Sequence, residues 1–60
     1  MSEYTMEELE EAKTALTSTL HKCEKIQAGK RLAASQQTLL DRRVRALCLA
    51  LELIEEEIND

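Results

Sequence analysis

Residues 40–58, LDRRVRALCLALELIEEEI, largely decide the fold of this chain. Large apolar side chains recur there four and three residues apart, which places them on one side of an α-helix. They are Leu40, Val44, Leu47, Leu51, Ile54 and Ile58. The rest of the sequence agrees, because it contains no proline, a single glycine and no run of β-branched or aromatic residues typical of strands. The sequence therefore predicts an all-α protein.

Another helix is predicted upstream, over about residues 5–28. Thr5 followed three residues later by Glu8 is a capping-box pattern, in which each side chain accepts a hydrogen bond from the other residue's backbone amide. The acidic residues around it complement the positive end of the helix dipole. Gly29 is predicted to end the helix as a left-handed C-terminal cap. The apolar positions in between keep helical spacing and comprise Leu9, Ala12, Leu16, Leu20, Cys23 and Ile26.

The two helices are predicted to fold back on each other as an antiparallel hairpin, a single domain over residues 1–60. The connection covers about residues 29–34 and the second helix about residues 34–58, beginning near Lys30 or, as we favour, at a Ser35 cap. One continuous coiled-coil helix is the alternative, because a single heptad frame stays in phase from Leu9 to Ile58. That frame turns polar or small around the only glycine, which favours the hairpin. The interrupting residues are Thr19, Lys30, Ala33 and Gln37.

The second helix carries more apolar surface than one partner helix can cover. From residue 46 to residue 51 every direction of the helix is apolar, which is typical of a buried helix. A chain of 60 residues also buries only about 60% of the surface that it exposes when unfolded, so its stability margin is thin. We therefore expect a homo-oligomer, with a dimeric four-helix bundle favoured. The residues expected to contact a second copy are Leu39, Leu49 and Leu53.

Charge divides the predicted hairpin into two poles. The open end gathers ten carboxylates and one lysine, a net charge of −9, and the loop half gathers seven cations and two carboxylates, a net charge of +5. Together they give the net charge of −4, and they predict head-to-tail pairing of two hairpins with their loops at opposite ends. The basic half also allows another hypothesis, binding to the phosphate backbone of RNA or DNA. That patch would consist of Lys30, Arg31, Arg42, Arg43 and Arg45.

No set of residues indicates catalysis, and we expect a non-enzymatic protein without cofactor or metal. His21, the only histidine, lies off the apolar stripe and is predicted to be solvated. It stands two positions from Cys23, and such residues point to nearly opposite sides of a helix. Cys23 and Cys48 are predicted to be buried free thiols, because the hairpin register separates them by more than a disulfide can span.

Parts of the chain resemble short uncharacterised helical-hairpin proteins of Gram-positive bacteria and their mobile elements. The similarity lies in residues 19–25 (TLHKCEK), 35–40 (SQQTLL) and 42–47 (RRVRAL). In size, acidity and architecture alone, the chain also resembles the Rop-type RNA-binding hairpins, which dimerise into four-helix bundles. These resemblances imply a hairpin fold and carry over no site residues.

The expected function is that of a small interaction or regulatory module, acting through self-association and an unidentified protein partner. Nucleic-acid binding is the alternative, disfavoured by the negative net charge and by the lack of aromatic residues among the arginines. No signal peptide and no apolar run long enough to cross a membrane is visible, so a cytoplasmic location without membrane attachment is expected.

Overall fold

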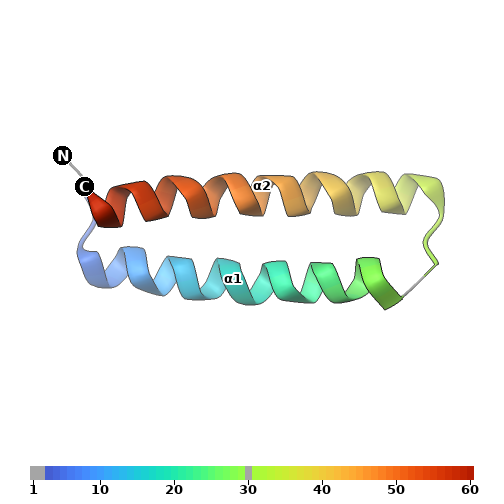
Figure 1. Cartoon of the computed structure of the whole chain (residues 1–60), viewed down its shortest axis with the longest axis horizontal. Helices are drawn as coiled ribbons and strands as arrows, with labels where there is room; N and C mark the ends of the chain where they lie inside the picture. The colour runs from blue at the N-terminus through green and yellow to red at the C-terminus, as the bar shows by residue number, and fades with distance from the viewer. Residues whose placement is uncertain (1–2, 30) are drawn as a thin grey trace.

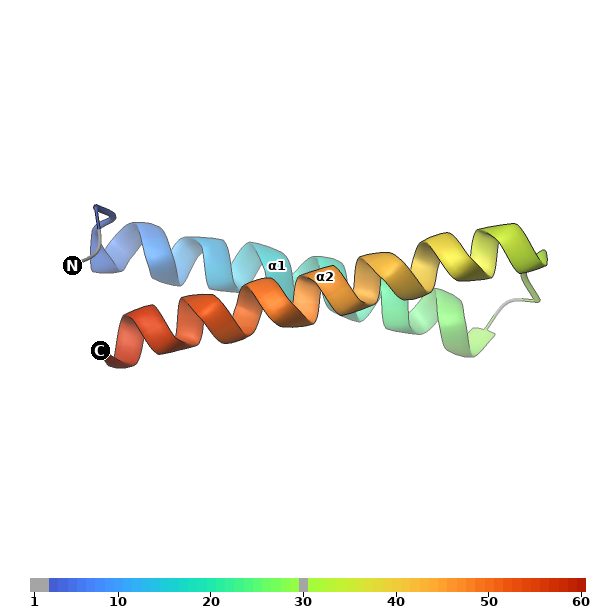
Figure 2. The ribbon, with the colours of Figure 1, turned by 90° about the horizontal axis from the view of Figure 1, so that it is seen from above.

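The computed structural model describes residues 3–29 and 31–60, which form two antiparallel helices. α1 spans Met6–Gly29 and α2 spans Ala34–Asn59. Figure 1 shows them side by side along a rod of 42 × 15 × 14 Å, with the start of α1 and the end of α2 at one end. Seen from above, the helices cross at a shallow angle (Figure 2). The predicted all-α hairpin is confirmed, and the continuous helix is excluded.

The start of α1 follows the capping-box pattern. The Thr5 backbone amide donates to Glu8 Oε1 at 3.0 Å, and the Glu8 amide donates to Thr5 Oγ1 at 3.1 Å. These bonds satisfy amides that the first turn of a helix leaves without partners. The Thr5 backbone and side-chain hydrogen bonds also hold the pKa of the Glu8 carboxyl below its usual value.

The end of α1 differs from the prediction. Gly29 is itself the last helical residue, and no glycine in the described residues has a positive φ. The predicted left-handed cap at Gly29 is therefore wrong. Gly29 thus lacks the left-handed conformation that a glycine cap adopts.

The start of α2 also differs. The helix begins at Ala34, after Ala33 in an extended conformation (φ −62°, ψ 152°), and no side chain caps it. Instead the Ala33 carbonyl accepts the Gln37 amide at 2.9 Å, so the predicted Ser35 cap is wrong. Ser35 therefore lies within the first turn of α2 and not at its N-cap position, where a serine hydroxyl accepts the first free amides.

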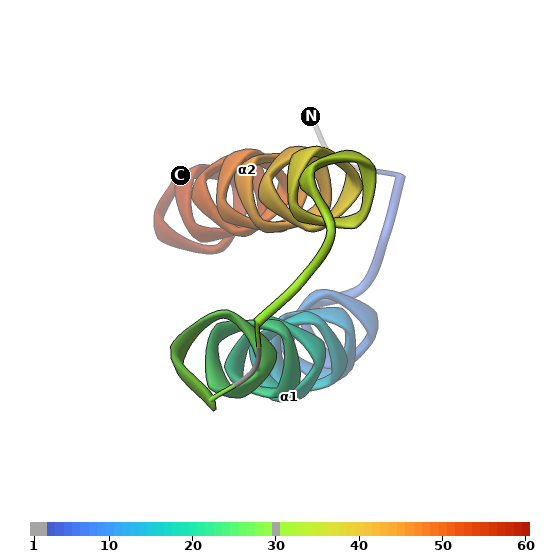
Figure 3. The ribbon, with the colours of Figure 1, turned by 90° about the vertical axis from the view of Figure 1, so that its right-hand side faces the viewer.

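The core lies along the line where the two helices meet. Most of the predicted apolar stripe is half-buried, and in residues 3–29 and 31–60 only Cys23 and Leu40 are buried, at 8% and 7% exposure. Seen end-on in Figure 3, the molecule is a single pair of helices, so each helix has one covered side. Two residues predicted to be buried are exposed. Ile26 is 40% exposed, and Cys48 is an exposed free thiol, so its predicted burial is wrong.

In residues 3–29 and 31–60, two side-chain contacts join the helices along one side. Lys13 Nζ pairs with Glu55 Oε1 at 2.5 Å near the open end, and Gln27 Nε2 donates to Asp41 Oδ1 at 2.8 Å near the loop. The hydrogen bond and the charge of Lys13 lower the pKa of Glu55. Because both contacts are exposed, they set the register of the hairpin more than its stability.

Candidate interaction surface

The most apolar part of the surface is a stripe along α2, away from α1. Leu39, Leu49 and Leu53 are 54%, 58% and 59% exposed, and the exposed Ala46 lies between them. Leu39, Ala46 and Leu53 are seven residues apart, and Leu49 is three residues from Ala46 and four from Leu53, so all four share one side of the helix. We call these four residues the α2 stripe. Their role as an interface stays a prediction.

This stripe is unusual for a chain with so small a core. Single exposed leucines are common on protein surfaces, whereas a contiguous row marks an interaction site or a tendency to aggregate. Here three large side chains are more than half exposed while two residues are buried among those described. The chain therefore leaves apolar surface uncovered that a second molecule could bury.

A groove at the loop end extends the stripe onto α1. It has a volume of about 240 Å³ and is lined by Ile26 of α1, Leu32 of the connection, and Gln36, Leu39, Leu40 and Arg43 of α2. Sequence reasoning placed Ile26 in the core and gave Leu32 no role. Their positions could have predicted this groove. Ile26 lies in the last turns of α1, and Leu32 is the one large apolar residue of the connection.

The arginines of the predicted basic patch are exposed but point in different directions. Arg31, Arg42, Arg43 and Arg45 are all exposed in the loop half, while Lys30 lies outside the described residues. None of these arginines forms an ion pair in the described part of the chain. Successive residues differ by about 100° around a helix, so Arg42 and Arg43 project in clearly different directions. The structure therefore spreads these charges around α2.

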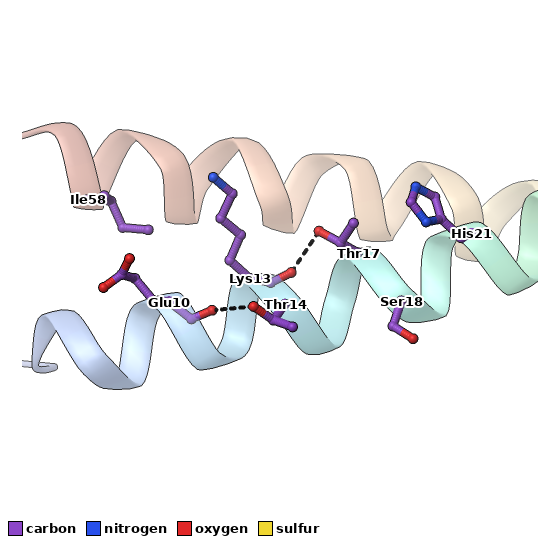
Figure 4. Close-up of a pocket in the computed structure, with 7 residues that line it drawn as sticks. All are labelled: Glu10, Lys13, Thr14, Thr17, Ser18, His21 and Ile58. Carbon is purple, nitrogen blue, oxygen red and sulfur yellow. Dashed lines mark hydrogen bonds between the residues drawn. The ribbon is translucent and has the colours of Figure 1, made fainter.

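Another hollow of the hairpin is lined mostly by polar residues (Figure 4). Its volume is about 560 Å³, and its lining residues are Glu10, Lys13, Thr14, Thr17, Ser18, His21 and Ile58. The Thr14 and Thr17 hydroxyls donate to the carbonyls of Glu10 and Lys13, at 3.1 and 2.7 Å. Lys13 already pairs with Glu55. The side chains of Lys13, Thr14 and Thr17 are thus engaged within the hairpin.

The residues considered for chemistry are dispersed. His21 is exposed, as predicted, and Cys23 is buried on another side of α1. In the part of the chain that the structure covers, no three His, Cys, Asp or Glu side chains gather where they could hold a metal ion.

Comparisons with protein-family models, with curated proteins and with solved structures find no match to this chain. Neither α1 nor α2 combines the length and the apolar character that a membrane-spanning helix needs. The fold and its surface therefore define a helical hairpin with an uncovered apolar stripe.

Proposed function

We propose that this protein is a small interaction module that self-associates through the α2 stripe and forms a dimeric four-helix bundle. The observation that carries the proposal is the contrast between three leucines more than half exposed and a core with two buried residues among those described. Domains below about 70–80 residues commonly need a disulfide, a metal or a partner chain for stability. Both cysteines are free, which favours a partner chain over a disulfide.

The gross free energy of burying the stripe is of the same order as the net free energy of a micromolar dimer, so further contacts must offset the cost of association. Fully burying a leucine contributes about 1.5–3 kcal/mol. Scaled by exposures of 54–59%, the three leucines contribute about 3–5 kcal/mol per chain, or about 6–10 kcal/mol for two chains. A micromolar dimer requires about 8 kcal/mol of net binding free energy. Ala46 and Ile26 add contact area, which helps to offset the translational and rotational freedom lost on association.

The solution mass tests this proposal. Light scattering coupled to size exclusion, at low and high salt, should give twice the 6.8 kDa mass of the chain at micromolar concentration. A monomer at both salt concentrations would contradict self-association. It would leave the stripe as the surface on which to seek a different protein partner.

A second candidate function is binding of RNA or DNA by the loop-half arginines. The observation that favours it is that Arg31, Arg42, Arg43 and Arg45 are exposed and lack ion pairs in the described residues. Phosphate contacts of this kind weaken steeply as salt rises. A gel-shift titration against mixed RNA and DNA should then show binding at low salt that disappears at high salt. No shift at low salt would remove this candidate.

A further inference from the structure

We propose that the second copy packs antiparallel along α2, with Arg42 and Arg45 of each chain facing Glu56 and Glu52 of the other. This inference rests on the proposed self-association through the α2 stripe. It keeps the head-to-tail orientation expected from the charge poles, and it adds the contacting helix, the register and the charge pairs.

The charges on the exposed side of α2 follow the heptad spacing. Residues seven apart lie nearly above one another on a helix, so each such series forms a line along its surface. One line, on one side of Leu39, Ala46 and Leu53, reads Arg42, Leu49, Glu56. A second, on the other side of those residues and next to the core, reads Arg43, Ala50, Glu57. A third, at the edge of the stripe, reads Arg45, Glu52. Every line is positive toward the loop and negative toward the open end of the hairpin.

This polarity distinguishes the two ways of pairing α2 with a copy of itself. In a parallel pair each arginine would face an arginine, and each glutamate a glutamate. In an antiparallel pair related by a two-fold axis, each line meets the same line reversed, and opposite charges face each other. Arg45 and Glu52 lie on the same edge of the stripe, and the two-fold axis keeps that edge facing itself. The surface is therefore self-complementary only in the antiparallel orientation.

The charges select one register. A two-fold axis level with Leu47 and Cys48 places Ala46 opposite Leu49 of the second copy, a small residue against a large one. Arg42 then lies opposite the second copy's Leu53 and three residues from its Glu56. At a rise of 1.5 Å per residue this offset is about 4.5 Å, less than one helical turn. The Arg42 stem can cover Leu53 while its guanidinium reaches Glu56.

Within one chain these charged side chains form no ion pair among the described residues. Arg42, Arg45, Glu52 and Glu56 are all exposed, and the ion pair found in the described residues joins Lys13 to Glu55 instead. α2 has no acidic residue in its first turn and no basic residue in its last. Glu56, in the last turn, opposes the dipole of its own helix. An arginine from an antiparallel second copy would compensate for that unfavourable position.

Charge reversal tests the orientation. One variant carries Arg42→Glu and Arg45→Glu, a second carries Glu52→Lys and Glu56→Lys, and a third carries all four changes. The dimer dissociation constant of each is measured by sedimentation equilibrium, with circular dichroism to establish that the helices remain. None of these changes adds charge that opposes the helix dipole, so a weaker dimer could not be ascribed to a weaker helix.

In the antiparallel arrangement, either double variant meets like charges at both ends of the interface. Each exposed ion pair contributes a factor of about 1.4 to 5 to the dissociation constant, and replacing attraction by repulsion counts that factor twice. Four pairs change sign, so we expect the dissociation constant to rise at least roughly 15-fold. The fourfold variant should return to within about threefold of the parent chain. A 1:1 mixture of the two double variants should likewise form a heterodimer.

Three results would overturn the inference. If the parent chain dimerises and the double variants dimerise equally well, the orientation is refuted while the proposed self-association stands. If the fourfold variant stays as weak as the double variants, the paired residues are wrong. If the parent chain is monomeric at micromolar concentration, the inference fails together with the proposed function.

Discussion

Leu53→Ala is the single substitution that should most directly separate the hairpin from its dimer. Leu53 is 59% exposed in one chain, and its truncation opens no cavity in the hairpin core. Alanine is also the better helix former, so α2 should remain intact. Burying the exposed part of a leucine contributes about 1–2 kcal/mol, of which alanine keeps the smaller part.

The loss occurs twice in a symmetric dimer, once for each chain. About 1.5–2.5 kcal/mol is therefore removed from association, which raises the dimer dissociation constant roughly 10- to 70-fold. Sedimentation equilibrium over a concentration series measures this constant, and circular dichroism checks that helix content is unchanged. Met6→Ala is the matched control, because Met6 is 50% exposed on α1 and lies outside the α2 stripe. The reasoning is refuted if both variants dimerise as tightly as the parent chain, or if Met6→Ala weakens the dimer as much as Leu53→Ala.

Three further outcomes follow from the hairpin itself. Thr5→Ala should lower the free energy of unfolding by about 0.5–2 kcal/mol, because it removes the capping hydroxyl of α1. Thermal unfolding followed by circular dichroism measures this change, and an unchanged midpoint would contradict the role of the cap. Lys13 lowers the pKa of Glu55 in the folded chain. The contribution of this pair to stability is therefore fully present above the ordinary pKa of 4.5, and it is lost as the pH falls through the lower pKa of the folded chain. Glu55→Gln should therefore reduce the loss of stability in acid, and equal acid sensitivity would rule out that contribution. In the native chain a thiol reagent should modify the exposed Cys48 faster than the buried Cys23, whereas equal rates would show that the burial difference is not maintained in solution.

The helices themselves were predictable from local pattern. The start of α1 follows from Thr5 and Glu8, because a capping box involves residues three apart and needs nothing from the rest of the chain. The sides of the helices that face each other follow from the alternation of four and three, which is a property of helix geometry. The division of α2 into a core side and a second apolar side could also be predicted, and Leu39, Leu49 and Leu53 are found exposed.

The helix ends beside the connection were harder to predict. Gly29 and Ser35 are good local signals for a C-cap and an N-cap, yet neither has that role in the structure. Both signals describe preferences of about 1 kcal/mol, which partial burial of a nearby apolar side chain such as Leu32 is large enough to override. Ile26 lies on the predicted stripe but remains 40% exposed in the last turn of α1.

The sequence by itself determined that this protein is helical, where its helices lie to within a few residues, and which residues of α2 face away from α1. These depend on hydrogen bonds and side-chain spacings within a few turns of chain. Only the tertiary structure decided that Cys48 is exposed, that Lys13 meets Glu55, and that Ile26 and Leu39 line one groove. Each of these depends on the register and crossing of two helices. The spacing of apolar residues along one helix carries no information about either.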